Sequence, residues 1–195
     1  VRPIGLWYPK QQKMQALCIA ALVLLPVSVA QSCSGSKVPA AEKTTFLTMH
    51  NALRSSISSG KFKAAGKAMP AAKTAIPALT WDCGLEGTAQ KWADNCKFQH
   101  TPNAPYGENL AYSSVKNTAG MANTSCTMWQ DEFQTAGFPA TITMNNFGAV
   151  GHATQMAWAK TTKVGCGMTV CPNLGTLVVC QYSPAGNMLN QAVYN

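Results

Sequence analysis

The chain has 195 residues and a mass of 20.7 kDa, which is the size of one domain or at most two small ones. Hydrophobic residues make up 47% and charged residues 11%, a balance that excludes a disordered tail and favours a packed core. The formal charge is +8, from 15 basic and 7 acidic residues, and the eight cysteines are unusually many for this length.

The first thirty residues predict a secretory signal peptide. Residues 16–25 (ALCIAALVLL) form an apolar run of ten, far short of the roughly 20 that a membrane-spanning helix needs. Lys10 and Lys13 precede the run, and the small residues Ser28 and Ala30 follow it at the positions that signal peptidase prefers. We therefore expect residues 1–30 to be leader and signal peptide, with Met14 as initiator, no transmembrane segment and a secreted, extracellular product. The alternative is a buried N-terminal helix.

Removal of residues 1–30 leaves 12 basic and 7 acidic residues, a net charge of +5, and seven cysteines. In a secreted chain such cysteines predict disulfides, and an odd number leaves one thiol free or paired between molecules. Zinc held by cysteine is disfavoured because no C-x-x-C pair occurs. The sequon Asn123-Thr124-Ser125 predicts a glycan on Asn123. The seven are Cys33, Cys83, Cys96, Cys126, Cys166, Cys171 and Cys180.

The first half of the mature chain predicts two helices joined by a loop. Apolar residues recur every three or four positions over 39–58, which predicts a helix ended by Gly60. Residues 59–80 are rich in Lys, Ala, Gly and Pro and predict a loop. Asp82 can cap a second helix whose apolar face runs from Leu85 to Cys96.

The second half predicts strands as well as helices. A short strand is expected over 109–112, a helix over 118–134, a loop over 137–148 and a short helix over 154–159. Residues 164–170 and 176–182 predict two strands joined by a turn at 171–175. This order favours a single α+β layered domain over residues 31–195.

Four polar residues stand out among apolar or turn-rich neighbours: His100, Glu108, Glu132 and His152. Imidazoles are good zinc ligands, and carboxylates can act as further ligands, as partners of the histidines or as a base. The four can converge only through the fold, so the sequence leaves open a metal site and a hydrogen-bonded polar network that stabilises a cleft. His50, beside the apolar stripe of the first helix, is expected to make a structural hydrogen bond.

Four ordered motifs resemble the CAP superfamily of cysteine-rich secretory, antigen 5 and pathogenesis-related 1 proteins. Residues 151–167 (GHATQMAWAKTTKVGCG) resemble its first signature, and residues 178–187 (VVCQYSPAGN) its second. Residues 106–111 (YGENLA) and the set His50-Asn51-x-x-Arg54 match two further blocks. The similarity spans about residues 42–190 and is greatest to the single-domain venom-allergen-like secreted proteins of parasitic nematodes.

The resemblance implies an α-β-α sandwich with a small antiparallel sheet between helices, stapled by disulfides, and with an open cleft. It implies that His100 and His152 can bind a divalent cation such as zinc, weakly, with Glu108 and Glu132 as acidic partners in the cleft. It also implies the disulfides Cys96–Cys171 and Cys166–Cys180. Of the remaining cysteines we expect Cys83 to pair with Cys126, which leaves Cys33 unpaired or bound to another molecule.

Three functions follow as expectations. The resemblance implies a secreted protein that binds lipid, a sterol or a fatty acid, and acts on host extracellular partners with an immunomodulatory or effector role. Candidate lipid contacts are Phe133, Phe138 and Phe147, which alternatively seal the core, or a groove between the first and third helices.

The first alternative function is a metal-assisted hydrolase or peptidase, although neither H-E-x-x-H nor G-x-S-x-G occurs. The second is a glycosaminoglycan-binding module that uses Lys61, Lys63, Lys67 and Lys73, which otherwise form a solvated loop. A nucleic-acid partner is not expected, since no aromatic-basic recognition motif occurs.

Overall fold

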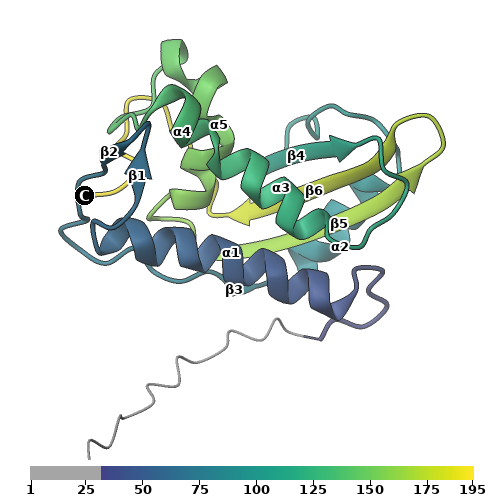
Figure 1. The fold of residues 1–195 in the computed structure, drawn as a ribbon. Coiled ribbons are helices and arrows are strands. Elements are labelled where there is room, and N and C mark those ends of the chain that lie inside the picture. Colours follow the sequence, from purple (N-terminus) through teal and green to yellow (C-terminus); the bar gives the residue numbers. More distant parts are fainter. Residues whose placement is uncertain (1–31) are drawn as a thin grey trace, which may run out of the picture.

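The computed structural model describes residues 32–195, so the expected signal peptide lies outside the described residues. The chain forms three layers (Figure 1). Helices α1 (Ala40–Ser58), α3 (Met121–Gln130) and α5 (Met144–Ala157) contact one another on one side of a sheet. Helix α2 (Cys83–Ala93) packs on the other side, against β5 and β6. The expected α-β-α sandwich is confirmed, and no helix of residues 32–195 is both long and apolar enough to cross a membrane.

The sheet has four strands in the order β3-β5-β6-β4. Strand β5 (Lys163–Cys171) pairs antiparallel with β6 (Gly175–Ser183), which pairs antiparallel with β4 (Gly107–Ser113). The two residues of β3 (Thr80–Trp81) join the edge in parallel with β5. Gly165 and Gly167 let α2 approach β5 closely, because a Cβ at Gly167 would lie 2.3 Å from the backbone of Gln90.

Two helices begin where side chains satisfy their free N–H groups. Asp82 accepts a hydrogen bond from the Leu85 amide at 3.0 Å and so caps α2, as expected. Thr143 and Asn146 form a capping box at the start of α5. The expected loop over 137–148 and short helix over 154–159 are therefore wrong in part, since 144–157 is one continuous helix.

Two further segments differ from the sequence prediction. The helix expected over 118–134 is divided at Asp131 into α3 and the short α4 (Glu132–Ala136). Within the expected loop 59–80, strands β1 (Lys63–Ala64) and β2 (Lys67–Ala68) form a hairpin around Ala65 and Gly66. Both turn residues have positive φ, 49° and 75°, as the type I′ turn of a two-residue hairpin requires.

A buried arginine ties the helical layer to two loops. Arg54 of α1 is 1% exposed and donates hydrogen bonds to four backbone carbonyls. Burial lowers its pKa to about 10, so the guanidinium stays charged at neutral pH. One arginine therefore fixes the segment before β3 and the turn after α5. The four carbonyls belong to Pro77, Met156, Trp158 and Thr161.

Disulfides Cys96–Cys171 and Cys166–Cys180 form as the resemblance implied. The expected Cys83–Cys126 pair is wrong, because Cys83 bonds Cys33. Cys126 faces the core from α3, whereas Cys83 begins α2 on the other side of the sheet. Cys126 is a fully buried free thiol, so an intermolecular disulfide through the odd cysteine is not available to the folded protein.

Candidate functional site

The four expected site residues come from four separate segments, and three of them line one cavity. His100 lies in the loop after α2, Glu108 in β4, Glu132 at the first position of α4 and His152 in α5. Three of them, His100, Glu108 and His152, line a cavity of about 190 Å³ together with Asn109, Phe147, Gly148 and Gly151. Glu132 reaches this cavity through its contact with His152.

The first imidazole–carboxylate pair is anchored by a buried glutamate. Glu108 Oε1 lies 3.0 Å from His100 Nδ1 and accepts the Thr101 amide at 2.9 Å. Its Oε2 accepts the Thr101 hydroxyl at 2.6 Å and the Gln181 amide at 2.9 Å. Burial acts to raise the pKa of Glu108, but these hydrogen bonds outweigh it and leave the pKa below its usual value. Glu108 is therefore an ionised acceptor at neutral pH.

The second pair is shorter and is braced by an aromatic ring. Glu132 Oε1 lies 2.6 Å from His152 Nδ1, and Glu132 Oε2 accepts the Ala153 amide at 2.9 Å. The Trp129 ring stacks on the His152 ring with centroids 6.1 Å apart. The Asn109 side chain donates to the His152 carbonyl, so β4 also fixes this turn of α5.

Both imidazoles thus use Nδ1 toward a carboxylate. Among residues 32–195, no hydrogen bond involves the Nε2 atom of either ring. A neutral imidazole that donates from Nδ1 carries its lone pair on Nε2, which is how carboxylates orient metal-binding histidines. This donor set fits a cation held by two nitrogens with water in the other positions. The described residues contain no group of three or more His, Cys, Asp or Glu suited to a metal ion, so a closed structural site is excluded there.

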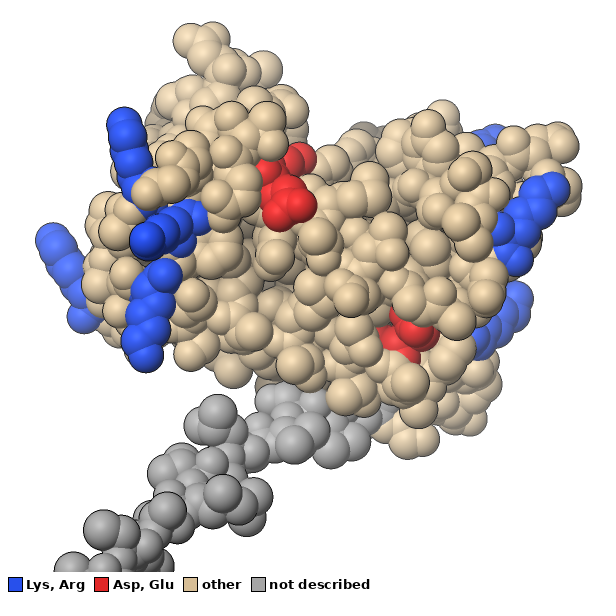
Figure 2. Space-filling model, viewed as in Figure 1, with Lys and Arg blue, Asp and Glu red and all other residues tan. Residues whose placement is uncertain are grey.

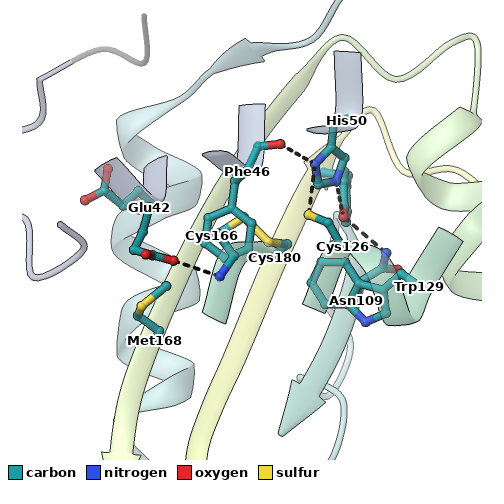
Figure 3. Close-up of a disulfide and its surroundings, with 12 residues drawn as sticks. Glu42, Phe46, His50, Asn109, Cys126, Trp129, Cys166, Met168 and Cys180 are labelled. Carbon is teal, nitrogen blue, oxygen red and sulfur yellow. Dashed lines mark hydrogen bonds between the residues drawn. A yellow bond between two sulfur atoms is a disulfide. The ribbon is translucent and has the colours of Figure 1, made fainter. Parts of the chain in front are cut away.

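His50 belongs to a buried network and not to the cleft (Figure 3). Its Nδ1 donates to the Phe46 carbonyl at 2.7 Å, and its Nε2 accepts the Tyr182 hydroxyl at 2.8 Å. Asn109 donates to the same hydroxyl, and the Cys126 sulfur lies 3.7 Å from Nδ1. Burial lowers the pKa of His50 to about 4, so the ring is neutral at pH 7. The expected structural role of His50 is confirmed.

The three candidate lipid-contact aromatics lie in different environments. Phe133 is fully buried between Phe62 and Phe138. Phe138 stacks on Tyr194 and lines a second cavity, of about 410 Å³, between the β1–β2 hairpin and α4. Phe147 is 44% exposed and lines the histidine cavity. The structure therefore does not bring the three together into one aromatic site.

The glycosylation candidate Asn123 is exposed on α3, and its Oδ1 accepts the Thr127 hydroxyl. Ser125, the third residue of the sequon, is fully buried, and its hydroxyl has no hydrogen-bond partner among the described residues. The folded helix therefore hides one of the residues that a glycosyltransferase reads.

Thr101 and Gln181 were not singled out from the sequence, although both fix Glu108. Gln181 in turn accepts the Thr88 hydroxyl from α2, at 2.5 Å. One signal in the sequence could have identified Gln181: it is a polar residue in an otherwise apolar strand segment, and such a buried polar group needs a hydrogen-bond partner. The segment is Val178-Val179-Cys180-Gln181-Tyr182, and all of it is buried. Thr101 has no comparable signal, because threonine is common in loops.

Comparison with known proteins agrees with this architecture. The CAP family, described as the cysteine-rich secretory protein family, matches residues 47–182. Venom allergen 3 of Solenopsis invicta is 38% identical over 173 residues, which cover 79% of this chain and 72% of that protein. The crystal structure of NaASP2 with Zn2+ has a TM-score of 0.79 and 36% identity, covering 84% of this chain and 90% of that one.

BmVAL-1 has a TM-score of 0.74 and 32% identity, covering 85% of this chain and 87% of its own. The family matches most of the chain, and Venom allergen 3 is similar in sequence at more than 30% identity. Fold, disulfides and sequence similarity lead to one assignment: the chain is a venom-allergen-like protein and belongs to the CAP family.

Proposed function

We propose that this chain is an extracellular binding protein whose cleft holds a divalent cation of the zinc class. His100 and His152 bind it through Nε2, while Glu108 and Glu132 orient the rings. The observation that carries the proposal is that both imidazoles on one cavity are held at Nδ1 by carboxylates. The similar NaASP2, whose crystal structure is described with Zn2+, supports the choice of metal.

A binding role is favoured over metal-assisted hydrolysis. A bound cation would supply Lewis acidity to a ligand in the cleft. A general base also needs an acceptor site on a carboxylate that can take a proton from water. Glu108 already accepts four hydrogen bonds, which fill the acceptor sites of a carboxylate, and Glu132 is held at one oxygen by His152 and at the other by the Ala153 amide. These contacts support a role for both glutamates in orienting the histidines. Metal-assisted hydrolysis would instead predict a peptidase activity that the Glu108→Ala, Glu132→Ala double variant loses.

The test is zinc titration by calorimetry on oxidised protein of residues 31–195. We expect His100→Ala and His152→Ala each to weaken zinc binding at least tenfold, and Glu132→Gln to weaken it roughly 10–100-fold, as loss of an orienting carboxylate does elsewhere. Asn145→Ala is the control, since Asn145 is an exposed polar residue on the same helix as His152. Zinc binding that survives both histidine variants would locate the cation elsewhere and overturn the proposal.

Lipid binding is a second candidate, and it rests on the cavity between the β1–β2 hairpin and α4. Its walls are largely apolar, and its volume of about 410 Å³ is within the usual range of small-ligand sites. A sterol or a fatty acid is the ligand class, with Phe138 as a contact. Lys67 stands on the same hairpin face as Ala64, where it can meet a carboxylate. The lining consists of Ala64, Ala65, Lys67, Ala68, Met69, Pro70, Ala136, Gly137 and Phe138.

Labelled cholesterol and a labelled fatty acid, each with unlabelled competitor, test this candidate. Ala136→Trp places a bulky side chain at the cavity from the exposed last position of α4, whereas Ala119→Trp adds the same side chain at an exposed position outside the lining. We expect competable binding by the wild type and Ala119→Trp, and none by Ala136→Trp. Absence of competable binding of either lipid by folded wild-type protein would end this candidate.

Export and a host-directed role complete the proposal. Three disulfides support an oxidising compartment, in which such bonds persist. We propose cleavage near Ala30, a glycan on Asn123 added before α3 folds over Ser125, and an immunomodulatory or effector role through host extracellular proteins. Expression in a secreting cell tests the first two, because the N-terminus can be sequenced and glycosidase treatment should reduce the mass. Retention in the cytosol would contradict export.

A further inference from the structure

Four lysines of one short segment form an uncompensated basic surface. We call Lys61, Lys63, Lys67 and Lys73 the hairpin lysines. Residues 59–80 contain no Asp or Glu, and all four lysine side chains are exposed. Elsewhere Lys37 pairs with Asp94, Lys43 with Glu86 and Lys163 with Asp82. Within residues 32–195, no ion pair or side-chain hydrogen bond engages a hairpin lysine.

The segment that carries these lysines is held in place from several sides. The Gln134 side chain of α4 donates to the Lys63 carbonyl at 2.6 Å, and the Lys73 amide donates to the Asn195 carbonyl at 2.6 Å. The Tyr194 hydroxyl donates to the Pro70 carbonyl at 2.8 Å. The β1–β2 pairing and the tight turn between the strands fix the spacing of Lys63 and Lys67. The charges are therefore displayed on a fixed scaffold, which lowers the entropy lost on binding.

The hairpin lysines belong to one end of the molecule. Figure 2 shows a group of Lys and Arg side chains at the end where Figure 1 has β1 and β2, and a second group at the opposite end. Lys63 and Lys67 lie on opposite faces of the hairpin, since Lys63 pairs with Ala68 and Lys67 with Ala64. A ligand that contacts both must be long and flexible enough to pass around the hairpin, which excludes a small single anion as the best fit.

We propose that the hairpin lysines bind a linear sulfated polysaccharide of the glycosaminoglycan class. Closely spaced sulfates on a flexible chain complement ammonium groups that point from two faces of one hairpin. A membrane surface fits less well, because the exposed neighbours of the lysines are Ala, Gly, Ser, Pro and Thr, with no large apolar side chain to insert. Single-stranded nucleic acid also fits less well, because its bases stack on exposed aromatic side chains. The aromatic residues near the hairpin lysines, Phe62 and Phe138, are partly buried. The choice of an extracellular polyanion rests on the proposed export.

Binding to immobilised heparin tests whether the hairpin lysines hold a sulfated polysaccharide. The assay is run at about 0.15 M salt, where the electrostatic screening length is about 8 Å. The hairpin variant replaces all four hairpin lysines by alanine. The control variant replaces the exposed Lys91, Lys97, Lys116 and Lys160, so both variants have the same net charge. We expect the hairpin variant to lose affinity by roughly tenfold or more and the control by less than about threefold, because counterion release follows contacted charges. Gln134→Ala leaves the charge unchanged and should weaken binding by loosening the hairpin.

Several outcomes would overturn the proposal. Equal losses in the two quadruple variants would mean that net charge alone drives retention. Failure of the wild type to bind at this salt would exclude the surface, and stronger binding to anionic vesicles or to single-stranded DNA than to heparin would identify another partner class. Thermal unfolding of each variant checks that it is folded. If the quadruple hairpin variant is unfolded, the double variant Lys63→Ala, Lys67→Ala replaces it in the binding assay. The assay uses purified protein, so it does not depend on whether export is observed.

Discussion

The two cleft histidines share one arrangement but differ in their surroundings. His100 has 64% of its side chain exposed and His152 has 36%, while the partner Glu108 is only 4% exposed. Glu108 accepts four hydrogen bonds and Glu132 accepts two. A cation between the rings would therefore bind His100, whose partner carboxylate is held by further hydrogen bonds, and His152, whose ring stacks on Trp129. The more exposed His100 side chain is then the more flexible of the two ligands.

His50 should make the stability of the fold depend on pH. Burial is the main cause that lowers its pKa from 6.5 to about 4. Between these two values the unfolded chain binds a proton that the folded chain does not bind, so stability falls as the pH is lowered. The contribution of this residue is about 3 kcal/mol, fully present above pH 6.5 and lost toward pH 4.

Urea unfolding of wild type and His50→Gln at several pH values isolates this contribution. Glutamine does not titrate, so the variant should be less stable at pH 7, with the difference shrinking by about 3 kcal/mol toward pH 4. Carboxylates with lowered pKa, such as Glu108 and Asp82, titrate in both proteins and cancel in the comparison. Parallel curves for the two proteins would contradict the buried neutral imidazole.

Cys126 should be chemically inert until the protein unfolds. Its side chain is fully buried, and burial raises the pKa of the thiol well above its usual range. We expect a maleimide to leave native protein of residues 31–195 unlabelled and to add one label after denaturation without reductant. Peptide mapping should then recover Cys33 linked to Cys83. Labelling of the native protein, or a peptide that links Cys83 to Cys126, would contradict this pairing.

At the scale of elements, the contact of α2 with β5 depends on two glycines. A Cβ on Gly165 would lie 2.2 Å from the Glu86 amide nitrogen, and one on Gly167 would lie 2.3 Å from Gln90. These neighbours are backbone atoms of a helix, so they cannot move aside as a flexible side chain can. The close approach also lets the Gln90 side chain hydrogen-bond the Met168 backbone on β5.

Gly167→Ala should destabilise the protein by about 1–3 kcal/mol, the usual cost of overpacking, because α2 must shift away from the sheet. Gly87→Ala on the exposed side of α2 is the matched control, since no atom lies within 4 Å of its added Cβ. The control should be neutral or stabilised by up to about 1 kcal/mol, since alanine favours helix. Thermal unfolding measures both, and equal stability of the two variants would contradict the close packing.

Elements with strong local patterns could be predicted from the sequence, and those set by distant contacts could not. The stripe of α1 and the alternation of β5 and β6 gave their positions within one or two residues. Helix α5 was missed at its start because Gly148, Gly151 and its asparagines have low helix propensity. The packing of Val150, Ala153 and Met156 into the core outweighs that propensity.

The candidate site was predictable only in part, for the same reason. Four residues from four segments have no local spacing that brings them together, so their grouping came from the family resemblance. The hydrogen bonds of Thr101 and Gln181 to Glu108 require the fold, as does the third disulfide. Spacing could not distinguish Cys33 from Cys126 as the partner of Cys83, because only the layer order separates them.

For the whole molecule, stability and cation binding should be separable. Three disulfides and two hydrophobic clusters, a larger one that includes residues of α1, α3 and α5 and a smaller one that includes residues of α2, hold the described fold. The cleft instead offers two imidazole nitrogens on an open cavity, which is unlike a structural metal site. The buried pair Lys43–Glu86 joins α1 to α2 independently of the cleft.

Chelation should therefore leave the unfolding temperature unchanged, whereas reduction should lower it, because each native disulfide of a small domain contributes roughly 2–5 kcal/mol. Zinc added at about ten times its dissociation constant should stabilise the protein by only about 1.4 kcal/mol. Scanning calorimetry with a chelator, with excess zinc and with a reductant compares the three conditions. Unfolding by the chelator alone would mean that the cation is structural.

The most direct test of the cation site is anomalous diffraction at the zinc edge, from crystals of residues 31–195 grown with zinc. We expect one anomalous peak in the cleft, about 2.0–2.1 Å from Nε2 of both His100 and His152, with water in the other positions. Glu108 and Glu132 should remain on the Nδ1 atoms. A peak bound to only one of these histidines, a peak ligated directly by either glutamate, or zinc found only outside the cleft would contradict it.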